Sequence, residues 1–184
     1  EVADYTGFPE MLDGRVKTLH PKIHAAILAD RDNPDHMRQL AEAGIEPIDL
    51  VVVNLYPFED TVADPNCTFE QAIEMIDIGG VALLRAAAKN YRHVFVLSGG
   101  VANEYAFTLN TLREGDVHRE VAAEDAFWRT ADYDGQILAW LSSRGVALHI
   151  RRVRENADHE PDPCDLSACA PRCFLPLDGI GSLR

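Results

Sequence analysis

Asp49-Leu50-Val51-Val52-Val53-Asn54-Leu55 is a nearly continuous apolar run that turns polar at Asn54. A run of this kind is typical of a strand buried on both faces of a parallel sheet. Residues 93–97 read the same way and are closed by Ser98 and two glycines. Helical patterns alternate with these strands over 34–43, 68–76, 81–89, 101–113 and 119–141. This alternation predicts an α/β domain in which helices flank a parallel sheet.

Two of the predicted helices carry recognisable end signals. Thr68 and Gln71 fit a capping box, in which each side chain accepts a hydrogen bond from the other residue's backbone N–H. Gly44 is well placed to end the helix over 34–43. Two strands are too few for a stable sheet of this type, so the complete sheet is expected to contain more.

The composition excludes several classes of partner. A formal net charge of −13 over 184 residues argues against nucleic acid, because phosphate contacts need a basic face. No run approaches the roughly 20 apolar residues that span a bilayer, so no membrane partner is expected. The chain starts at Glu1 without an initiator Met or the pattern of a signal peptide. We therefore expect a fragment or processed product located in the cytoplasm.

Two clusters of basic residues stand out in this acidic chain. They are Arg15, Lys17, His20, Lys22 and His24 in the first, and Arg85, Lys89, Arg92 and His93 in the second. Such local clusters predict a small anionic ligand held at one place on the molecule. The alternative is a pair of solvated, partly neutralised faces.

Three short blocks place polar groups at the edges of apolar elements. They are Gly14-Arg15-Val16-Lys17-Thr18-Leu19-His20-Pro21, Asn54-Leu55-Tyr56-Pro57-Phe58, and Asp77-Ile78-Gly79-Gly80 running on to Lys89-Asn90. Arg15 and Lys17, two residues apart, are expected on the same side of an extended segment. The second block falls at the carboxyl end of the first predicted strand, where ligands bind in such sheets. The paired glycines offer backbone N–H groups at a helix start, which suit an anion.

Residues 1–142 resemble, without large gaps, the IMP cyclohydrolase domain of the bifunctional purine-biosynthesis enzymes. The resemblance rests on the three blocks, on residues 6–28 and on Ala126-Phe127-Trp128-Arg129-Thr130-Ala131-Asp132-Tyr133-Asp134. It implies a methylglyoxal-synthase-like, Rossmann-like three-layer fold. It implies closure of 5-formamidoimidazole-4-carboxamide ribonucleotide to IMP with loss of water, on a small anionic nucleotide substrate in a cytoplasmic homodimer. No cofactor or metal is implied for this step, because 10-formyltetrahydrofolate serves the family's separate AICAR transformylase domain.

The resemblance also implies which residues form the site. The catalytic set would be Lys17, Tyr56, Asp77 and Lys89, and the substrate contacts would be Arg15, Thr18, Asn54, Gly79 and Gly80. The carboxamide nitrogen is a poor nucleophile, and its attack on the formyl carbon places negative charge on the formyl oxygen. A Lys or Tyr donor stabilises that charge. Asp77 would accept the amide proton, and a Tyr56–Lys89 pair would protonate the departing hydroxyl. Which lysine plays which part cannot be read from the sequence.

Each of these residues also has a plain structural interpretation. Tyr56 fits an aromatic at the edge of the core, Asp77 a helix cap and Lys89 a cation in a last helical turn. Asp77 and Lys89 are twelve residues apart, which is about 18 Å along a continuous helix. Both touch one small substrate only if Gly79–Gly80 forms a loop that folds back, or if a neighbouring chain contributes.

The chain departs from the family pattern at both ends. We expect the chain to lack the family's first strand–helix unit, which holds the ribose phosphate, and the transformylase domain that follows the region of resemblance. Residues 143–184 are expected to be a non-family tail of loop or disorder. Cys164, Cys169 and Cys173 lack the paired spacing of zinc sites, so no metal is expected there. From this chain alone we expect weak ring-closing activity or none.

Two other hypotheses compete with the enzyme. A methylglyoxal-synthase-like module that senses a nucleotide without chemistry needs phosphate ligands but not the four catalytic side chains together. An inactive truncated product differs in stability instead and would melt non-cooperatively. The presence of all four side chains favours the cyclohydrolase over the sensor.

Overall fold

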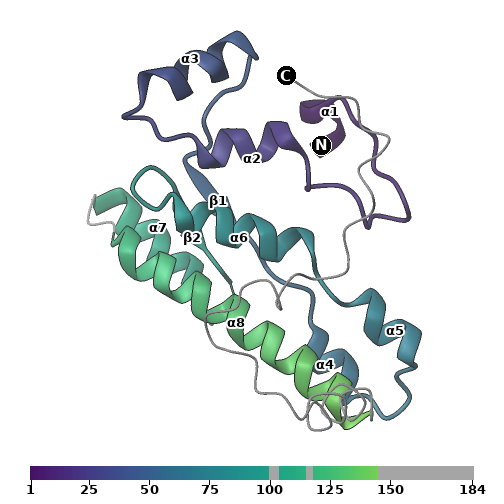
Figure 1. Ribbon diagram of the computed structural model, residues 1–184. Helices are drawn as coiled ribbons and strands as arrows, with labels where there is room; N and C mark the ends of the chain where they lie inside the picture. Colours follow the sequence, from purple (N-terminus) through teal and green to yellow (C-terminus); the bar gives the residue numbers. More distant parts are fainter. Residues whose placement is uncertain (100–103, 115–117, 145–184) are drawn as a thin grey trace, which may run out of the picture. The chain divides into compact units, whose positions relative to one another are not determined.

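The computed structural model describes residues 1–99, 104–114 and 118–144. In chain order its elements are α1 (Val2–Thr6), α2 (Pro21–Leu28), α3 (Pro34–Glu42), β1 (Leu50–Val52), α4 (Phe58–Ala63), α5 (Phe69–Glu74), α6 (Gly79–Lys89), β2 (Phe95–Leu97), α7 (Glu104–Glu114) and α8 (Arg119–Ser143) (Figure 1). The chain divides into two compact units, 1–141 and 142–184, and the site lies in the first. The predicted tail over 143–184 falls almost wholly outside the described residues, so its boundary stays a prediction.

The described residues form a parallel pair of strands joined by a helical crossover. Leu50 pairs with Phe95, Val51 with Val96 and Val52 with Leu97. Helices α4, α5 and α6 connect the strands, and α6 packs against both of them and against α2 (Figure 1). The predicted α/β class, with helices flanking a parallel sheet, is confirmed.

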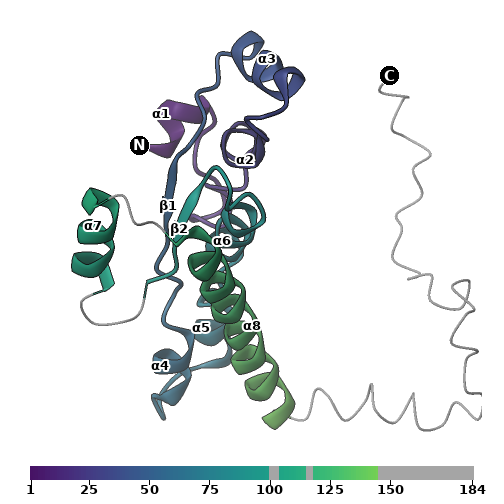
Figure 2. The ribbon, with the colours of Figure 1, turned by 90° about the vertical axis from the view of Figure 1, so that its left-hand side faces the viewer.

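The two strands differ in how far they are covered. All three residues of β2 are buried, whereas in β1 only Val51 is. Leu50 and Val52 are 44% and 46% exposed, so the expectation of burial on both faces is wrong for β1. Val51 faces the layer of α2 and α6, and the alternation of side chains along a strand turns its neighbours to the other face. Figure 2 shows α7 on that other side, where it does not cover these two residues.

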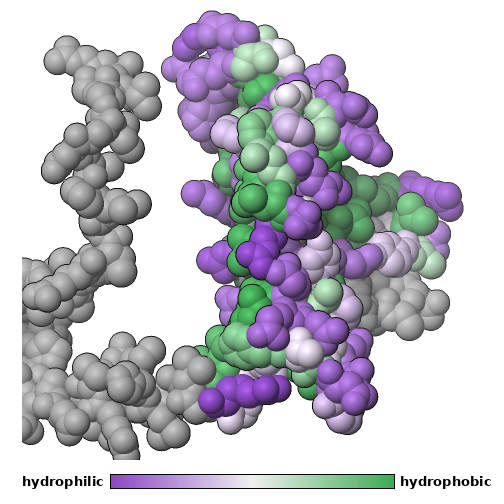
Figure 3. Space-filling view, turned by 90° about the vertical axis from the view of Figure 1, so that its right-hand side faces the viewer, coloured by the Kyte–Doolittle hydropathy of each residue, from purple (hydrophilic) through white to green (hydrophobic). Residues whose placement is uncertain are grey.

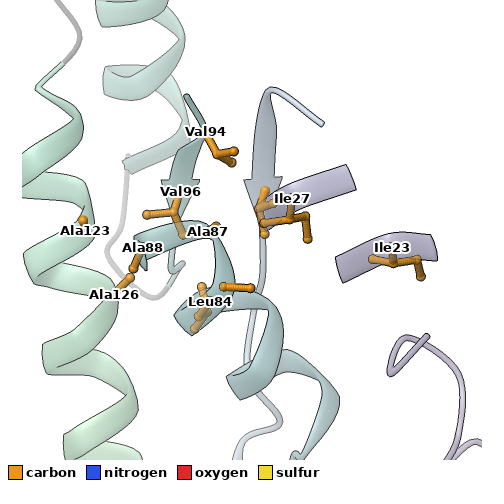
Figure 4. Packing of buried hydrophobic residues seen from close by; sticks show 11 residues of the cluster. Ile23, Ile27, Leu84, Ala87, Ala88, Val94, Val96, Ala123 and Ala126 are labelled. Atoms are coloured by element: carbon orange, nitrogen blue, oxygen red, sulfur yellow. The ribbon is translucent and has the colours of Figure 1, made fainter. Parts of the chain in front are cut away.

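The main core lies between the strands and the helices α2, α6 and α8. Its buried members are Ile23, Ile27, Val51, Leu84, Ala86, Ala87, Ala88, Val94, Val96, Ala123 and Ala126 (Figure 4). The run of alanines at the end of α6 presents short side chains, so the helix can approach β2 and α8 closely. A second cluster joins α4, α5 and α8 through Phe58, Ala72, Tyr133 and Trp140.

Local signals explain where several helices begin. The predicted capping box of α5 is confirmed: Thr68 Oγ1 accepts from Gln71 N–H at 3.2 Å, and Gln71 Oε1 accepts from Thr68 N–H at 2.9 Å. Helix α2 was not predicted, because its cap is a histidine. His20 Nδ1 accepts from Lys22 N–H at 3.1 Å, and Pro21 takes the first helical position, which suits its fixed φ.

No helix in the described part of the chain is long and apolar enough to cross a membrane.

Candidate functional site

A cavity of about 800 Å³ lies beside the carboxyl end of β1. Three separate parts of the chain line it: the loop before α2, the segment that follows β1, and the connection from α5 into α6. Eight of the nine predicted site residues are among the lining residues. They are Arg15, Lys17, Thr18, Asn54, Tyr56, Asp77, Gly79 and Gly80.

The loop that carries the two cations is a tight turn. Met11 and Val16 form an antiparallel bridge, and the residues between them include three with positive φ: Leu12 at 56°, Asp13 at 53° and Gly14 at 93°. Only glycine adopts this region without cost, so the turn is locally strained at its first two positions. The expected extended segment is therefore replaced by a turn, from which Arg15 and Lys17 still reach the same cavity.

Both cations are paired with carboxylates. Arg15 binds Glu74 through Nη2 and through Nε, the latter at 3.3 Å, and Lys17 Nζ lies 2.7 Å from Glu10 Oε2. The hydrogen bond to Glu10 raises the pKa of Lys17, and the bond to Arg15 lowers the pKa of Glu74. A lysine held in its charged form at neutral pH is suited to donating a hydrogen bond or a proton, and not to accepting one.

The amino end of α6 forms the floor of the cavity. Gly79 and Gly80 are the first two residues of α6, and Asp77 Oδ1 accepts from Gly80 N–H at 2.6 Å. A Cβ at Gly79 would collide with Thr18 Oγ1, and one at Gly80 would collide with the Asp77 carboxylate. At both positions a side chain of the site lies directly against the backbone, so a larger residue would force Thr18 or Asp77 to shift. Ile78 is the N-cap residue of α6, but the Asp77 carboxylate one position earlier accepts the bond from the first turn and also lines the cavity.

Lys89 is the predicted site residue that does not reach this cavity. It is exposed in the last turn of α6, ten residues after Gly79, or about 15 Å along the helix. The fold-back loop considered for Gly79–Gly80 does not form, because both residues are helical. Lys89 lines neither of the two cavities that Tyr56 lines, and the Tyr56–Lys89 pair stays a prediction. In its own helix Lys89 is a cation favourably placed near the negative end of the dipole.

Asn54 and Tyr56 stand between two cavities. A second cavity, of about 350 Å³, shares these two residues with the first and is otherwise lined from α4, α8 and the end of β2. Asn54 Oδ1 accepts from Tyr105 Oη at 2.6 Å and lies against Gly99, whose φ is +65°. Tyr56 is half exposed, so its hydroxyl is open to a ligand.

Tyr133 of α8 fixes the segment that carries Asp77. Its hydroxyl donates to the carbonyl of Met75 at 2.7 Å and accepts from Asp77 N–H at 2.9 Å. The side chain is buried, and this burial raises the pKa of the phenol. Sequence reasoning gave Glu10 no role in the site, and it gave none to Tyr133 or Glu74 either. Tyr133 is 56 residues from Asp77 and Glu74 is 59 from Arg15, so no local pattern could have found them.

Replacing Tyr133 by Phe removes the hydroxyl and keeps the ring. We expect the free energy of unfolding to fall by about 1–2 kcal/mol, because a backbone C=O and N–H lose their partner in a partly buried place. Tyr105→Phe is the matched control, since its hydroxyl bond to Asn54 is exposed and should contribute less. Urea unfolding of the two variants measures the difference. Equal losses would contradict a special role for the Tyr133 hydroxyl.

Two family models cover successive parts of the chain. Residues 1–82 match the MGS-like domain, and residues 87–161 match the AICARFT/IMPCHase bienzyme. The chain is similar to the MGS-like domain over its first part and to the AICARFT/IMPCHase bienzyme over its second. The resemblance found in the sequence is thereby confirmed, and so is the methylglyoxal-synthase-like fold.

Similar proteins agree with this assignment. The bifunctional purine biosynthesis protein PurH of Magnetococcus marinus is 55% identical over 148 residues, which is 78% of this chain and 27% of that protein. PurH of Chloroflexus aurantiacus is 59% identical over 143 residues, covering 76% of this chain and 28% of that protein. The chain thus spans about a quarter of the length of these curated relatives. The crystal structure of ForH matches with a TM-score of 0.60 and 37% identity, over 74% of this chain and 71% of that one.

Proposed function

We propose that the cavity beside β1 is an IMP cyclohydrolase site, which closes 5-formamidoimidazole-4-carboxamide ribonucleotide to IMP with loss of water. One observation carries the proposal. Eight residues that the family resemblance marks as site residues come from three separate segments and line a single cavity. Its volume of about 800 Å³ falls in the range of small-molecule sites, roughly 300–1,000 Å³.

Each of the eight predicted site residues that line the cavity has a part in this reaction. Lys17, kept protonated by Glu10, donates to the formyl oxygen as negative charge develops there. Asp77 accepts the proton that the carboxamide nitrogen loses when it attacks the formyl carbon. Tyr56 protonates the hydroxyl that leaves as water. Arg15, Thr18 and Asn54 orient the substrate, and Gly79 and Gly80 let it approach the start of α6 closely.

The proposal also covers the cofactor requirement, the substrate class, the location and the oligomeric state of the enzyme. Ring closure with loss of water transfers no electrons and needs no organic cofactor or metal, and the two reacting groups already belong to one molecule. The partner is a small anionic nucleotide, and the enzyme acts in the cytoplasm as a homodimer. Figure 3 shows hydrophobic surface interleaved with hydrophilic surface on one face. Exposed side chains such as Leu12, Ile78 and Leu138 offer apolar area that a second copy would bury.

The test is absorbance-monitored ring closure of the formamido ribonucleotide by the purified chain, alongside a Lys89→Ala variant. We expect weak turnover, and we expect Lys89→Ala to retain it, because Lys89 lies outside the cavity that holds the other residues. Loss of turnover in Lys89→Ala would place Lys89 in the site of a second copy, since it does not reach the cavity of its own chain. Absence of turnover from a cooperatively folded chain that also fails to bind IMP would overturn the proposal.

A further inference from the structure

A histidine and two carboxylates converge at the end of the molecule away from the proposed site. His93 lies just before β2, and Asp30 and Asp32 lie in the loop after α2. The His93 Nε2 atom is 3.1 Å from Asp30 Oδ1 and 3.8 Å from Asp32 Oδ2. One ligand atom from each residue lies within 4.8 Å of the others. The cavity of the proposed site is lined by none of these residues.

The fold holds the two halves of this cluster together. Asn90, at the end of α6, donates through Nδ2 to the carbonyls of Ile27 at 2.7 Å and Ala29 at 2.9 Å. This clamp ties the end of α2 to the turn that carries His93. Only 14% of the His93 side chain is exposed, so its ring is fixed by packing. The cluster therefore lies in two loops that the Asn90 clamp joins next to the ends of α2 and α6.

The charges of the cluster favour a cation. Arg31, the basic residue between the two carboxylates, points elsewhere: its guanidinium binds Asp49 at 2.6 Å and the carbonyl of Ile48 at 2.9 Å. Asp30 Oδ1 also accepts a hydrogen bond from the N–H of Asp32 at 3.0 Å, which helps to hold that carboxylate in place beside His93. The cluster places two carboxylates around one ring nitrogen. A divalent cation would neutralise both.

We propose that His93, Asp30 and Asp32 form a zinc site. Zn²⁺ binds imidazole nitrogen and carboxylate oxygen at about 2.0–2.2 Å, so a tetrahedral ion holds its ligand atoms about 3.3 Å apart. The distances of 3.1 and 3.8 Å from His93 Nε2 bracket that spacing. The ion takes the place of the proton between Nε2 and Asp30, and water completes the coordination. A zinc ion with three protein ligands and one water is open to solvent, and the 84% exposure of the Asp32 side chain agrees with that.

The test is calorimetric titration of ZnCl₂ into the full chain carrying Cys164→Ser, Cys169→Ser and Cys173→Ser, because thiolates elsewhere would compete for Zn²⁺. We expect one strong site per chain. Asp32→Asn, at an exposed position that the fold does not need, should weaken it at least tenfold. His93→Gln, which keeps a donor for Asp30, should weaken it further. Asp35→Asn is the matched control, since it removes a neighbouring exposed carboxylate outside the cluster.

Two results would overturn the zinc site. One is the absence of heat from a saturable site up to millimolar Zn²⁺, which would leave the cluster as a His–Asp ion pair. The other is equal affinity in Asp32→Asn and Asp35→Asn. The visible absorption of Co²⁺ bound in place of Zn²⁺ gives a second readout, and its loss in Asp32→Asn alone would locate the ion. None of these outcomes depends on the proposed ring-closing activity.

Discussion

Replacing Lys17 by Met should lower the rate of ring closure a hundredfold or more while the chain stays folded. Lys17 is a cavity cation whose pKa is raised by its partner Glu10, so it is a charged donor throughout the neutral range. Removing one donor to a developing oxyanion costs about 10²–10³ in rate, or roughly 3–4 kcal/mol of transition-state stabilisation. Because Met keeps most of the volume of the side chain, the loop around residue 17 should keep its shape.

Lys22→Met is the control for this substitution. Lys22 is also a lysine of the first basic cluster, but its ammonium binds the carbonyl of Tyr5 and lies 4.4 Å from the Tyr5 ring centroid, and it does not line the cavity. The measurements are kcat/KM of ring closure and the Kd for IMP, each relative to the unsubstituted chain. If the two variants lose equal activity, the effect comes from net charge and Lys17 has no specific part.

Much of the fold follows from local pattern. The apolar runs located β1 and β2, and helical patterns located α3, α5, α6, α7 and α8, with end signals for α3 and α5. The first three residues of the helix predicted over 101–113 lie outside the described residues. Helices α1 and α4 are five and six residues long, too short to show a period, and α2 begins at a histidine cap. The exposure of Leu50 and Val52 is a tertiary property, since it depends on which helices cover each face of the strand.

The candidate site was also predicted only in part from local sequence pattern. The three blocks that lie next to the ends of elements reach one cavity, because the carboxyl end of β1 and the amino end of α6 meet there. Lys89 does not line that cavity, because the continuous helix α6 separates it from Gly79. The rise per residue of a helix already predicted this separation from the sequence. The sequence analysis did not predict the carboxylates of Glu10 and Glu74 as partners of the cations, or the hydroxyl of Tyr133 as a partner of the Asp77 segment. Each of these partners except Glu10 comes from a distant part of the chain.

Replacing Phe58 by Ala should cause the largest loss of stability of any single truncation near the site. Phe58 is 1% exposed, and its ring centroid lies 6.2 Å from that of Tyr133 and 5.7 Å from that of Trp140. Both neighbours meet it edge to face, so truncation opens a cavity that they cannot fill without moving. Such substitutions cost about 3–5 kcal/mol, against a total of about 5–15 kcal/mol for a typical domain.

Phe69→Ala separates this effect from the loss of any aromatic ring. Phe69 stacks on the same Trp140 at 5.3 Å but is 42% exposed, so its truncation leaves no enclosed cavity and should cost about 1 kcal/mol. Urea unfolding measures both losses, provided that the dependence on urea is the same for each variant. Because Phe58 packs on the tyrosine that holds the Asp77 segment, its loss should also weaken IMP binding at temperatures well below unfolding. Equal destabilisation by the two substitutions would mean that the second core cluster does not hold α4 against α8.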